Sequence, residues 1–431
     1  MIKTNFVAVW AGQMVSVFGS NLSSFALGVW LYQHTGSASN FALVALCTVL
    51  PQVLLSPLAG VWVDRHNRRW TMALADSGAA FCTLCLALLF VTGNIRVWHI
   101  FLAALLSSAC SSLQVPAYMA IVASTTAHSQ LGRANGLLQF GRALADILAP
   151  SVAGLLVVAV QIPGVLLIDL LTFCFAVSTL ALTRFPGAEE APAQRELAKA
   201  PWQQVLLAGW DALRTNSSLF TLLRYQALFA FLWSLFGVLV TPMLLGFSNP
   251  EGLGMTLTVA GLGLLTGGLI MTAWGGPRRR LPGLLFFELL SAFAFCLMGL
   301  RPNLILVAGA AFLAHWTLAF VSSLSEAIWQ GRVPQDVQGR IFALKQTVVQ
   351  AATLCAYLMA GMLADRILEP SLHAGGPLAG SLGAWFGVGP GRGIALLFFG
   401  IGLLKAVSVL WIVASAEARQ IDIPVSAFSR R

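Results

Sequence analysis

Ionisable side chains are scarce in this chain, and a few of them interrupt long apolar stretches. Arg142 and Asp146 lie one helical turn apart, Glu288 has no charged neighbour close in sequence, and Glu326 lies nearer the end of its stretch. A charged group at the centre of a bilayer costs about 2.5–3.5 kcal/mol on insertion scales, so such residues are candidates for function. The chemistry that we predict for them is proton exchange across a membrane.

Each of these residues also has a structural interpretation. Arg142 and Asp146 can neutralise each other across one helical turn. Glu288 can pair with a basic residue of another helix, which would make it a structural carboxylate instead of a proton carrier. The sequence leaves both interpretations open.

Other ionisable side chains have simpler explanations. Asp76 and Asp169 lie nearer the ends of their apolar stretches, where we expect solvation or helix capping to satisfy them. His315 lies in the middle of a stretch and is expected to make structural hydrogen bonds. Lys345 and Lys405 are long enough to reach the membrane surface with their ammonium groups.

The composition predicts a helical membrane protein. Of the 431 residues, 58% are hydrophobic and 10% are charged, and the mean hydropathy is +0.82. A soluble domain of this length needs more charge to cover its surface, and the apolar stretches are too long and continuous for a β-barrel. The net charge of +9 fits the surplus of Lys and Arg in cytoplasmic loops, so we expect no nucleic-acid partner.

Cysteine usage argues against metal sites and disulfides. All seven cysteines lie in apolar stretches, where Cys behaves as a small hydrophobic residue. The single C-x-x-C pair has no second pair and no His nearby. We therefore expect no metal and no cofactor.

Twelve apolar stretches are long enough to span a bilayer, which takes about 20 residues. We expect the spans at roughly 7–33, 41–63, 70–92, 98–124, 135–159, 163–183, 217–246, 253–274, 281–300, 303–328, 338–365 and 391–415. A polar stretch separates the sixth from the seventh. The predicted domains are an N-terminal six-helix bundle (1–184), a cytoplasmic linker with an amphipathic surface helix (185–216), and a C-terminal six-helix bundle with a cytoplasmic tail (217–431).

Basic residues predict the orientation of these spans. If the N-terminus is cytoplasmic, seventeen Lys and Arg fall on that side and four on the other, so both termini are expected to be cytoplasmic. The two halves also resemble each other, because residues 132–156 match residues 339–363 at nine of 25 positions. Such a repeat is typical of two-bundle transporters with a central cavity.

The stretch GVWVDRHNRR (60–69) gathers an Asp, three Arg and a His directly after an apolar run. It resembles the loop signature G-x-x-x-D-R-x-G-R-[KR] of the major facilitator superfamily, between the second and third helices. The matching residues are Gly60, Asp64, Arg65, Arg68 and Arg69. Asn67 replaces the second Gly, which suggests a turn with a positive φ. The resemblance implies an all-α fold of twelve transmembrane helices in two pseudo-symmetric bundles.

A second element, APSVAG (149–154), resembles the G-P-x-x-G-G motif of the proton-coupled exporters of this superfamily through Pro150 and Gly154. Pro150 would bend its helix as a pivot, or serve only in packing. Phrases such as ALGVWLYQHTGSA and GRANGLLQ are similar to bacterial macrolide-efflux and siderophore exporters. This resemblance implies a monomer in the bacterial cytoplasmic (inner) membrane that exports a small amphipathic organic molecule in antiport with protons.

The same resemblance places the first, fourth, seventh and tenth helices around a substrate cavity. The aromatic and amide side chains that they offer are Gln13, Asn21, Gln114, Tyr118, Tyr225, Trp233, His315 and Trp316. The Arg found on the fourth helix of many relatives is absent from 98–124. An uncoupled facilitator or a lipid transporter of the same fold remains an alternative. An integral membrane enzyme is a remote one, because no catalytic motif is present.

The arginines of the charged loop are explained by a role in fixing the orientation of the spans in the membrane. Asp64 is not, because an acidic residue contributes little to that signal. In the superfamily the equivalent carboxylate meets a helix N-terminus and Arg across the bundle interface, and here the partner helix starts near Arg340. A negative charge at a helix N-terminus gains about 0.3–1 kcal/mol, and this latch exists only while the cytoplasmic side is closed. We predict that Asp64→Asn impairs transport while membrane insertion stays intact. Normal transport by this variant would reduce the loop to an anchor.

Overall fold

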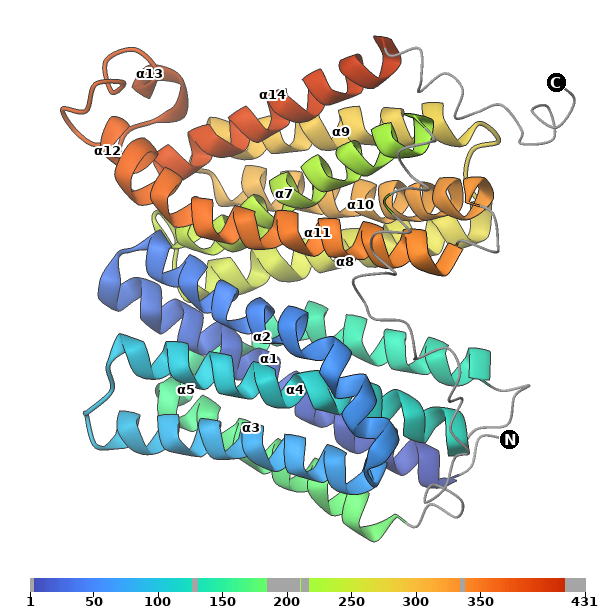
Figure 1. The fold of residues 1–431 in the computed structure, drawn as a ribbon. Coiled ribbons are helices and arrows are strands. Elements are labelled where there is room, and N and C mark those ends of the chain that lie inside the picture. Colours follow the sequence, from blue (N-terminus) through green and yellow to red (C-terminus); the bar gives the residue numbers. More distant parts are fainter. Residues whose placement is uncertain (1–3, 126–130, 184–209, 211–216, 334–337, 415–431) are drawn as a thin grey trace, which may run out of the picture. The chain divides into compact units, whose positions relative to one another are not determined.

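The structure described here is a computed structural model of the chain (Figure 1). It describes residues 4–125, 131–183, 210, 217–333 and 338–414. The predicted amphipathic helix of the linker lies outside these residues apart from Trp210, whose ring packs edge-on against Phe220 with the ring centroids 5.7 Å apart.

Long helices make up nearly all of the described chain. The first half contains α1 (Thr4–Thr35), α2 (Ala38–Arg65), α3 (Arg68–Val91), α4 (Val97–Thr125) and α5 (Leu131–Leu182). The second half contains α7 (Ser217–Leu245), α8 (Pro250–Trp274), α9 (Arg280–Leu300), α10 (Leu304–Arg332), α11 (Gln338–Gly361) and α14 (Arg392–Ala414). All of these helices are long and apolar enough to cross a membrane, which confirms the predicted all-α membrane fold.

The helix α5 contains two of the twelve predicted spans. Its helical geometry is interrupted at Gln161, where φ is 59° and ψ is 177°, and the chain turns back there (Figure 1). The interruption lies in the gap that the sequence predicts between the spans 135–159 and 163–183. A positive φ is unfavourable for a residue with a side chain, and Pro163, which suits the first turn of a helix, starts the second segment.

The turn between α2 and α3 differs from the expected one. Asn67 has φ −61° and ψ 117°, so the predicted positive φ is wrong. Its side-chain oxygen instead accepts hydrogen bonds from the backbone N–H groups of Arg69 at 3.0 Å and Trp70 at 3.4 Å. Asn67 is therefore the N-cap of α3, a position that Asn fills well because its side chain satisfies otherwise unpaired backbone donors.

The chain divides into two compact units. Unit 1 comprises Met1–Gln194 together with Ser248–Thr258, and unit 2 comprises Arg195–Phe247 together with Val259–Arg431. Within unit 1, α1 packs along α5, while α2 and α3 pack against α4. Within unit 2, α9 packs against α10 and α14, and α7 packs against α11. Each unit has its own buried apolar core.

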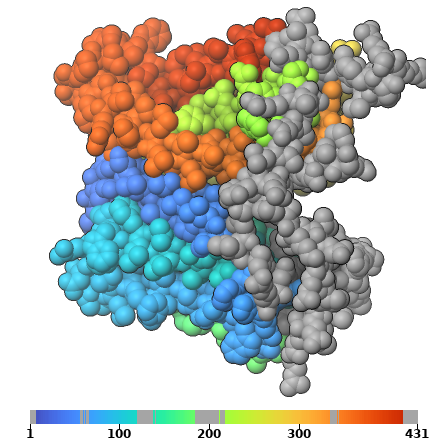
Figure 2. All heavy atoms as spheres, in the orientation of Figure 1, coloured from blue at the N-terminus to red at the C-terminus, as the bar shows by residue number. Residues whose placement is uncertain are grey.

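The Gly-rich segment between α11 and α14 forms a compact lobe (Figures 1 and 2). The π-helical turn η2 (Met362–Leu368) leads into the short helices α12 (Glu369–Ser371) and α13 (Gly383–Phe386). The Glu369 carboxylate accepts hydrogen bonds at 3.0 Å from the N–H groups of Gly391 and Ile394, and thereby caps the start of α14. Arg392 donates to two backbone carbonyls of unit 2, at 2.6 and 2.9 Å. These contacts fix the lobe to α14.

Small residues allow the beginning of α8 to approach α5 closely within unit 1. A methyl group on Gly154 would lie only 2.8 Å from the carbonyl oxygen of Pro250. The Ser151 hydroxyl lies 2.7 Å from the Thr258 hydroxyl. The exporter-like element APSVAG therefore lies on the face of α5 that meets α8, as expected where small residues permit close helix contact.

We expect Gly154→Ala to destabilise the protein, because its new methyl group would press on the backbone of α8. Overpacking of this kind costs about 1–3 kcal/mol. The matched control is Gly268→Ala on α8, where a methyl group would meet nothing within 4 Å and where Ala is the better helix former. Thermal unfolding in detergent should show a lower midpoint for Gly154→Ala alone. Equal midpoints would contradict the close packing.

Candidate functional site

In unit 1, three helices bring two amide side chains onto one buried carboxylate. Gln13 Nε2 of α1 donates to Asp76 Oδ2 of α3 at 2.9 Å, and Gln114 Nε2 of α4 donates to Asp76 Oδ1 at 2.6 Å. Gln114 Nε2 also lies 2.9 Å from Gln13 Oε1. Only 1% of Asp76 is exposed. The amides hold the carboxylate between α1, α3 and α4 through charge-assisted hydrogen bonds.

A second carboxylate is buried in the same unit. Asp169, in the second segment of α5, is 1% exposed. Its Oδ1 lies 3.4 Å from the hydroxyl of Ser20 on α1, and its Oδ2 lies 3.5 Å from the hydroxyl of Thr83 on α3. The expectation that solvation or capping would satisfy Asp76 and Asp169 is therefore wrong. Both lie about two turns inside their helices, on faces that pack against neighbouring helices.

Asp76 and Asp169 line a single cavity of about 470 Å³ in unit 1, which we call the unit-1 cavity. Its lining also contains nine Ser or Thr hydroxyls and three amide side chains. Among the described residues that line it, there is no Lys, Arg or His. Asn21 and Gln114 of the predicted substrate set belong to this lining. The cavity is thus acidic and well supplied with oxygen atoms.

Asp146 has a different partner from the predicted one. Asn21 Nδ2 of α1 donates to Asp146 Oδ1 at 2.8 Å, and Asp146 is exposed within unit 1. Of the ion pairs between described side chains, none joins Arg142 to Asp146, so this pairing is wrong. Arg142 instead lies close enough to interact electrostatically with Tyr118, whose buried hydroxyl makes no hydrogen bond with the described residues.

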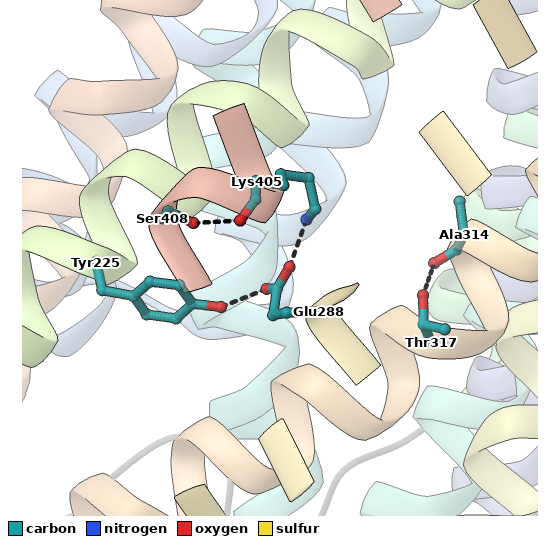
Figure 3. Close-up of polar contacts among 6 residues, drawn as sticks. All are labelled: Tyr225, Glu288, Ala314, Thr317, Lys405 and Ser408. Atoms are coloured by element: carbon teal, nitrogen blue, oxygen red, sulfur yellow. Dashed lines mark hydrogen bonds and ion pairs between the residues drawn. The ribbon is translucent and has the colours of Figure 1, made fainter. Parts of the chain in front are cut away.

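Unit 2 contains a buried ion pair (Figure 3). Lys405 Nζ of α14 lies 2.8 Å from Glu288 Oε2 of α9, and the hydroxyl of Tyr225 on α7 donates to Glu288 Oε1. Only 1% of Glu288 and 3% of Lys405 is exposed. The structural alternative for Glu288, a basic partner on another helix, is the one observed. Lys405 does not extend to the membrane surface as the sequence suggested.

Aromatic rings enclose this ion pair. Lys405 Nζ lies 4.7 Å from the ring centroid of Phe229 and 5.4 Å from that of Phe295, distances at which cation–π attraction operates. Trp233 packs edge-on against Phe295 and against His315, with centroid distances of 5.8 and 5.2 Å. The His315 Nδ1 atom lies 2.9 Å from the backbone carbonyl one turn earlier. Tyr225, Trp233 and His315 thus belong to one aromatic region of unit 2.

The remaining predicted residues of unit 2 lie in separate contacts. Trp316 packs against Phe320, with ring centroids 4.7 Å apart. Glu326 of α10 forms an ion pair with Lys345 of α11, and half of the Glu326 side chain is exposed. Lys345 is therefore neutralised by a neighbouring helix and is itself buried.

The two side chains that would form the predicted cytoplasmic latch, those of Asp64 and Arg340, are not among the described ones. Asp64 and Arg340 belong to α2 and α11 by their backbones, but the side chains at positions 60, 64, 65 and 340 lie outside the described residues. Arg69 is described, and its guanidinium donates to a backbone carbonyl at the end of α5 at 2.5 Å. The role of Asp64 stays a prediction.

We expect Glu288→Gln to be strongly destabilising, because it leaves Lys405 buried without a counter-charge. Removing one partner of a buried pair costs about 3–5 kcal/mol. The double variant Glu288→Gln with Lys405→Met should recover most of that loss, because no charge remains. Thermal unfolding of the wild type, both single variants and the double variant measures the coupling. Additive losses would contradict an ion pair that matters for stability.

The curated relatives of this chain include named efflux proteins. It is 26% identical over 370 residues to "Macrolide efflux protein A" of Streptococcus pyogenes, which covers 85% of this chain and 90% of that protein. It is 24% identical over 378 residues to "Multidrug efflux pump Tap" of Mycolicibacterium fortuitum, covering 86% and 89%.

Solved structures share the fold. A mutant of the nucleoside transporter NupG superposes with a TM-score of 0.71 at 12% identity, covering 95% of this chain and 99% of that one. A bacterial homologue of the human lysosomal transporter Spinster gives a TM-score of 0.69 at 14% identity, covering 97% of each. The sequence profile of the Major Facilitator Superfamily matches residues 9–357. Because this match extends over most of its length, the chain belongs to the major facilitator superfamily of membrane transporters.

Proposed function

We propose that this transporter exports a small amphipathic organic molecule, a drug or a natural product such as a macrolide, a peptide or a siderophore. It would work by alternating access, in antiport with protons. The observation that carries this proposal is the alignment of 85% of the chain with a protein named for macrolide efflux. A second efflux protein aligns over a similar length, so the similarity is not confined to one motif.

The size and lining of the unit-1 cavity support a role in binding an organic molecule. The unit-1 cavity measures about 470 Å³, within the range of about 300–1,000 Å³ typical of small-molecule sites. Its lining combines apolar side chains such as Phe41 and Phe173 with hydroxyls, amides and carboxylates. A mixed lining of this kind suits an amphipathic ligand, and an acidic one favours a ligand with a positive charge.

Proton coupling requires carboxyls whose charge is not already balanced. Glu288 and Glu326 are both ion-paired with lysines of neighbouring helices, which makes them weaker candidates than the sequence suggested. Asp146 is bonded to an amide, and Asp76 is bonded to two. Protonation of an ion-paired glutamate would leave its lysine without a counter-charge, whereas protonation of Asp76 or Asp146, which are bonded to neutral amides, leaves no unpaired cation. We propose these two as the proton carriers.

The remaining expectations belong to the same proposal. The transporter would lie in a bacterial cytoplasmic membrane with both termini in the cytoplasm and act as a monomer. It would use the proton-motive force and no cofactor. A proton that enters down a membrane potential of 100 mV supplies about 2.3 kcal/mol. An uncoupled facilitator or a lipid transporter would need no such carboxyls.

The experiment is uptake of a macrolide into inside-out proteoliposomes with an imposed pH gradient. We expect gradient-driven accumulation by the wild type, reduced at least about tenfold in Asp76→Asn or Asp146→Asn because the proton carrier is lost. The matched control is the charge-neutral double variant of Glu288 and Lys405, which should retain coupling. Accumulation indifferent to the gradient would overturn antiport, and unchanged coupling in both Asp variants would overturn the assigned carriers.

A further inference from the structure

The two buried carboxylates of unit 1 differ in the hydrogen-bond donors that surround them. Both oxygens of Asp76 receive amide N–H donors, at 2.9 and 2.6 Å. Hydroxyl groups approach Asp169 instead, those of Ser20 and Thr83 at 3.4 and 3.5 Å, and those of Ser23 and Thr172 also lie close to it. Hydroxyl donors to a carboxylate normally come within about 2.5–3.0 Å. Asp169 is therefore as deeply buried as Asp76, but its hydrogen bonds from Ser20 and Thr83 are long.

The hydroxyls of Ser20, Ser23 and Thr83 around Asp169 come from two helices. Ser20 and Ser23 lie on one face of α1, and Thr83 faces them from α3. The Ser23 hydroxyl approaches the Asp169 carboxyl, yet it is buried, with the residue 5% exposed, and has no hydrogen-bond partner among the described residues. A buried hydroxyl without a partner is costly. Its oxygen is available as a ligand, and it lines the unit-1 cavity together with Asp169.

The spacing of these oxygens fits a hard cation. A cation the size of Ca²⁺ or Na⁺ holds oxygen ligands at about 2.4 Å, and two such ligands at right angles lie about 3.4 Å apart. The hydroxyls of Ser20 and Thr83 lie 3.4 and 3.5 Å from the two oxygens of Asp169. Carboxylate and hydroxyl oxygens are also the ligands that hard cations prefer.

The single negative charge of the Asp169 site favours a monovalent cation. Asp76 is too distant to share a ligand with Asp169, because their α1 contacts Gln13 and Ser20 are two turns apart, about 10 Å. The Asp169 site thus has one negative charge. Among the described residues, no cluster of three or more His, Cys, Asp or Glu exists that would suit a transition metal. In the part of the chain that the structure describes, no basic side chain lines the cavity to neutralise Asp169.

We propose that Asp169, Ser20, Ser23 and Thr83 form a binding site for a monovalent cation inside unit 1. Its occupant is Na⁺ or a hydrated proton, which share this chemistry. The site is separate from the proton carriers proposed above. Binding to it does not depend on which molecule is exported, and only its use in coupling rests on the proposed function.

The test is equilibrium binding of ²²Na⁺ to the purified full chain in detergent, with choline replacing Na⁺ at constant ionic strength. We expect saturable binding of about one ion per chain. Asp169→Asn should abolish it, and Ser23→Ala should weaken it about tenfold, the factor that one ligand contact is worth. The matched control is Ser24→Ala, which removes a neighbouring hydroxyl of the cavity lining. It should bind as the wild type does.

A potentiometric measurement on the same samples distinguishes the two occupants. If no Na⁺ binds but Asp169→Asn binds one proton fewer per chain than the wild type at the assay pH, the site is a proton site. The proposal is overturned if the wild type binds no Na⁺ and the proton counts are equal. If the wild type does bind Na⁺, the proposal is also overturned when Ser23→Ala binds it equally well. Because no substrate is present, a failure of macrolide transport leaves these results unaffected.

Discussion

The need to balance charge inside an apolar helix bundle governs the interior of both units. In the second half of the chain, the third and sixth spans supply an acid and a base, Glu288 and Lys405, which meet at 2.8 Å. In the first half, the third and sixth spans supply two acids, Asp76 and Asp169, and none of the described residues that line their cavity is basic. An ion pair balances its own charge, whereas a buried carboxylate without a basic partner does not. The binding role that we propose for unit 1 and the structural role that we propose for the pair in unit 2 rest on this difference.

The surrounding helices are organised around these charges. Amides from α1 and α4 hold Asp76, and the hydroxyl of Tyr225 with the ring of Phe229 completes the surroundings of the ion pair in unit 2. Such polar contacts are local and directional, so they fix the rotation of each helix about its axis. Apolar packing alone specifies that rotation less strictly, because lipid and protein interiors are similarly apolar.

The fold could be predicted from the sequence to a greater extent than the site. Span length, composition and the GVWVDRHNRR stretch were enough for the helical membrane fold, because these are properties of single segments. Partners were not predictable in the same way. The sequence alone places Asp76 and Asp169 at solvated helix ends and identifies no partner for Glu288. Each error has one physical cause: a contact such as Lys405 with Glu288 joins residues 117 positions apart, and no local pattern encodes it. The signal that was available was the presence of Gln13 and Gln114 in otherwise apolar spans, since buried amides require polar partners.

We propose that unit 1 handles the coupling cation and that the ion pair in unit 2 is structural. Simultaneous recording of cation entry and macrolide exit in proteoliposomes tests this division of roles. We expect opposite fluxes in a fixed ratio, with cation flux lost when the unit-1 carboxyls are replaced by amides and kept when Glu288 and Lys405 are neutralised together. Macrolide flux without any cation flux, or cation flux that depends only on the unit-2 pair, would contradict it.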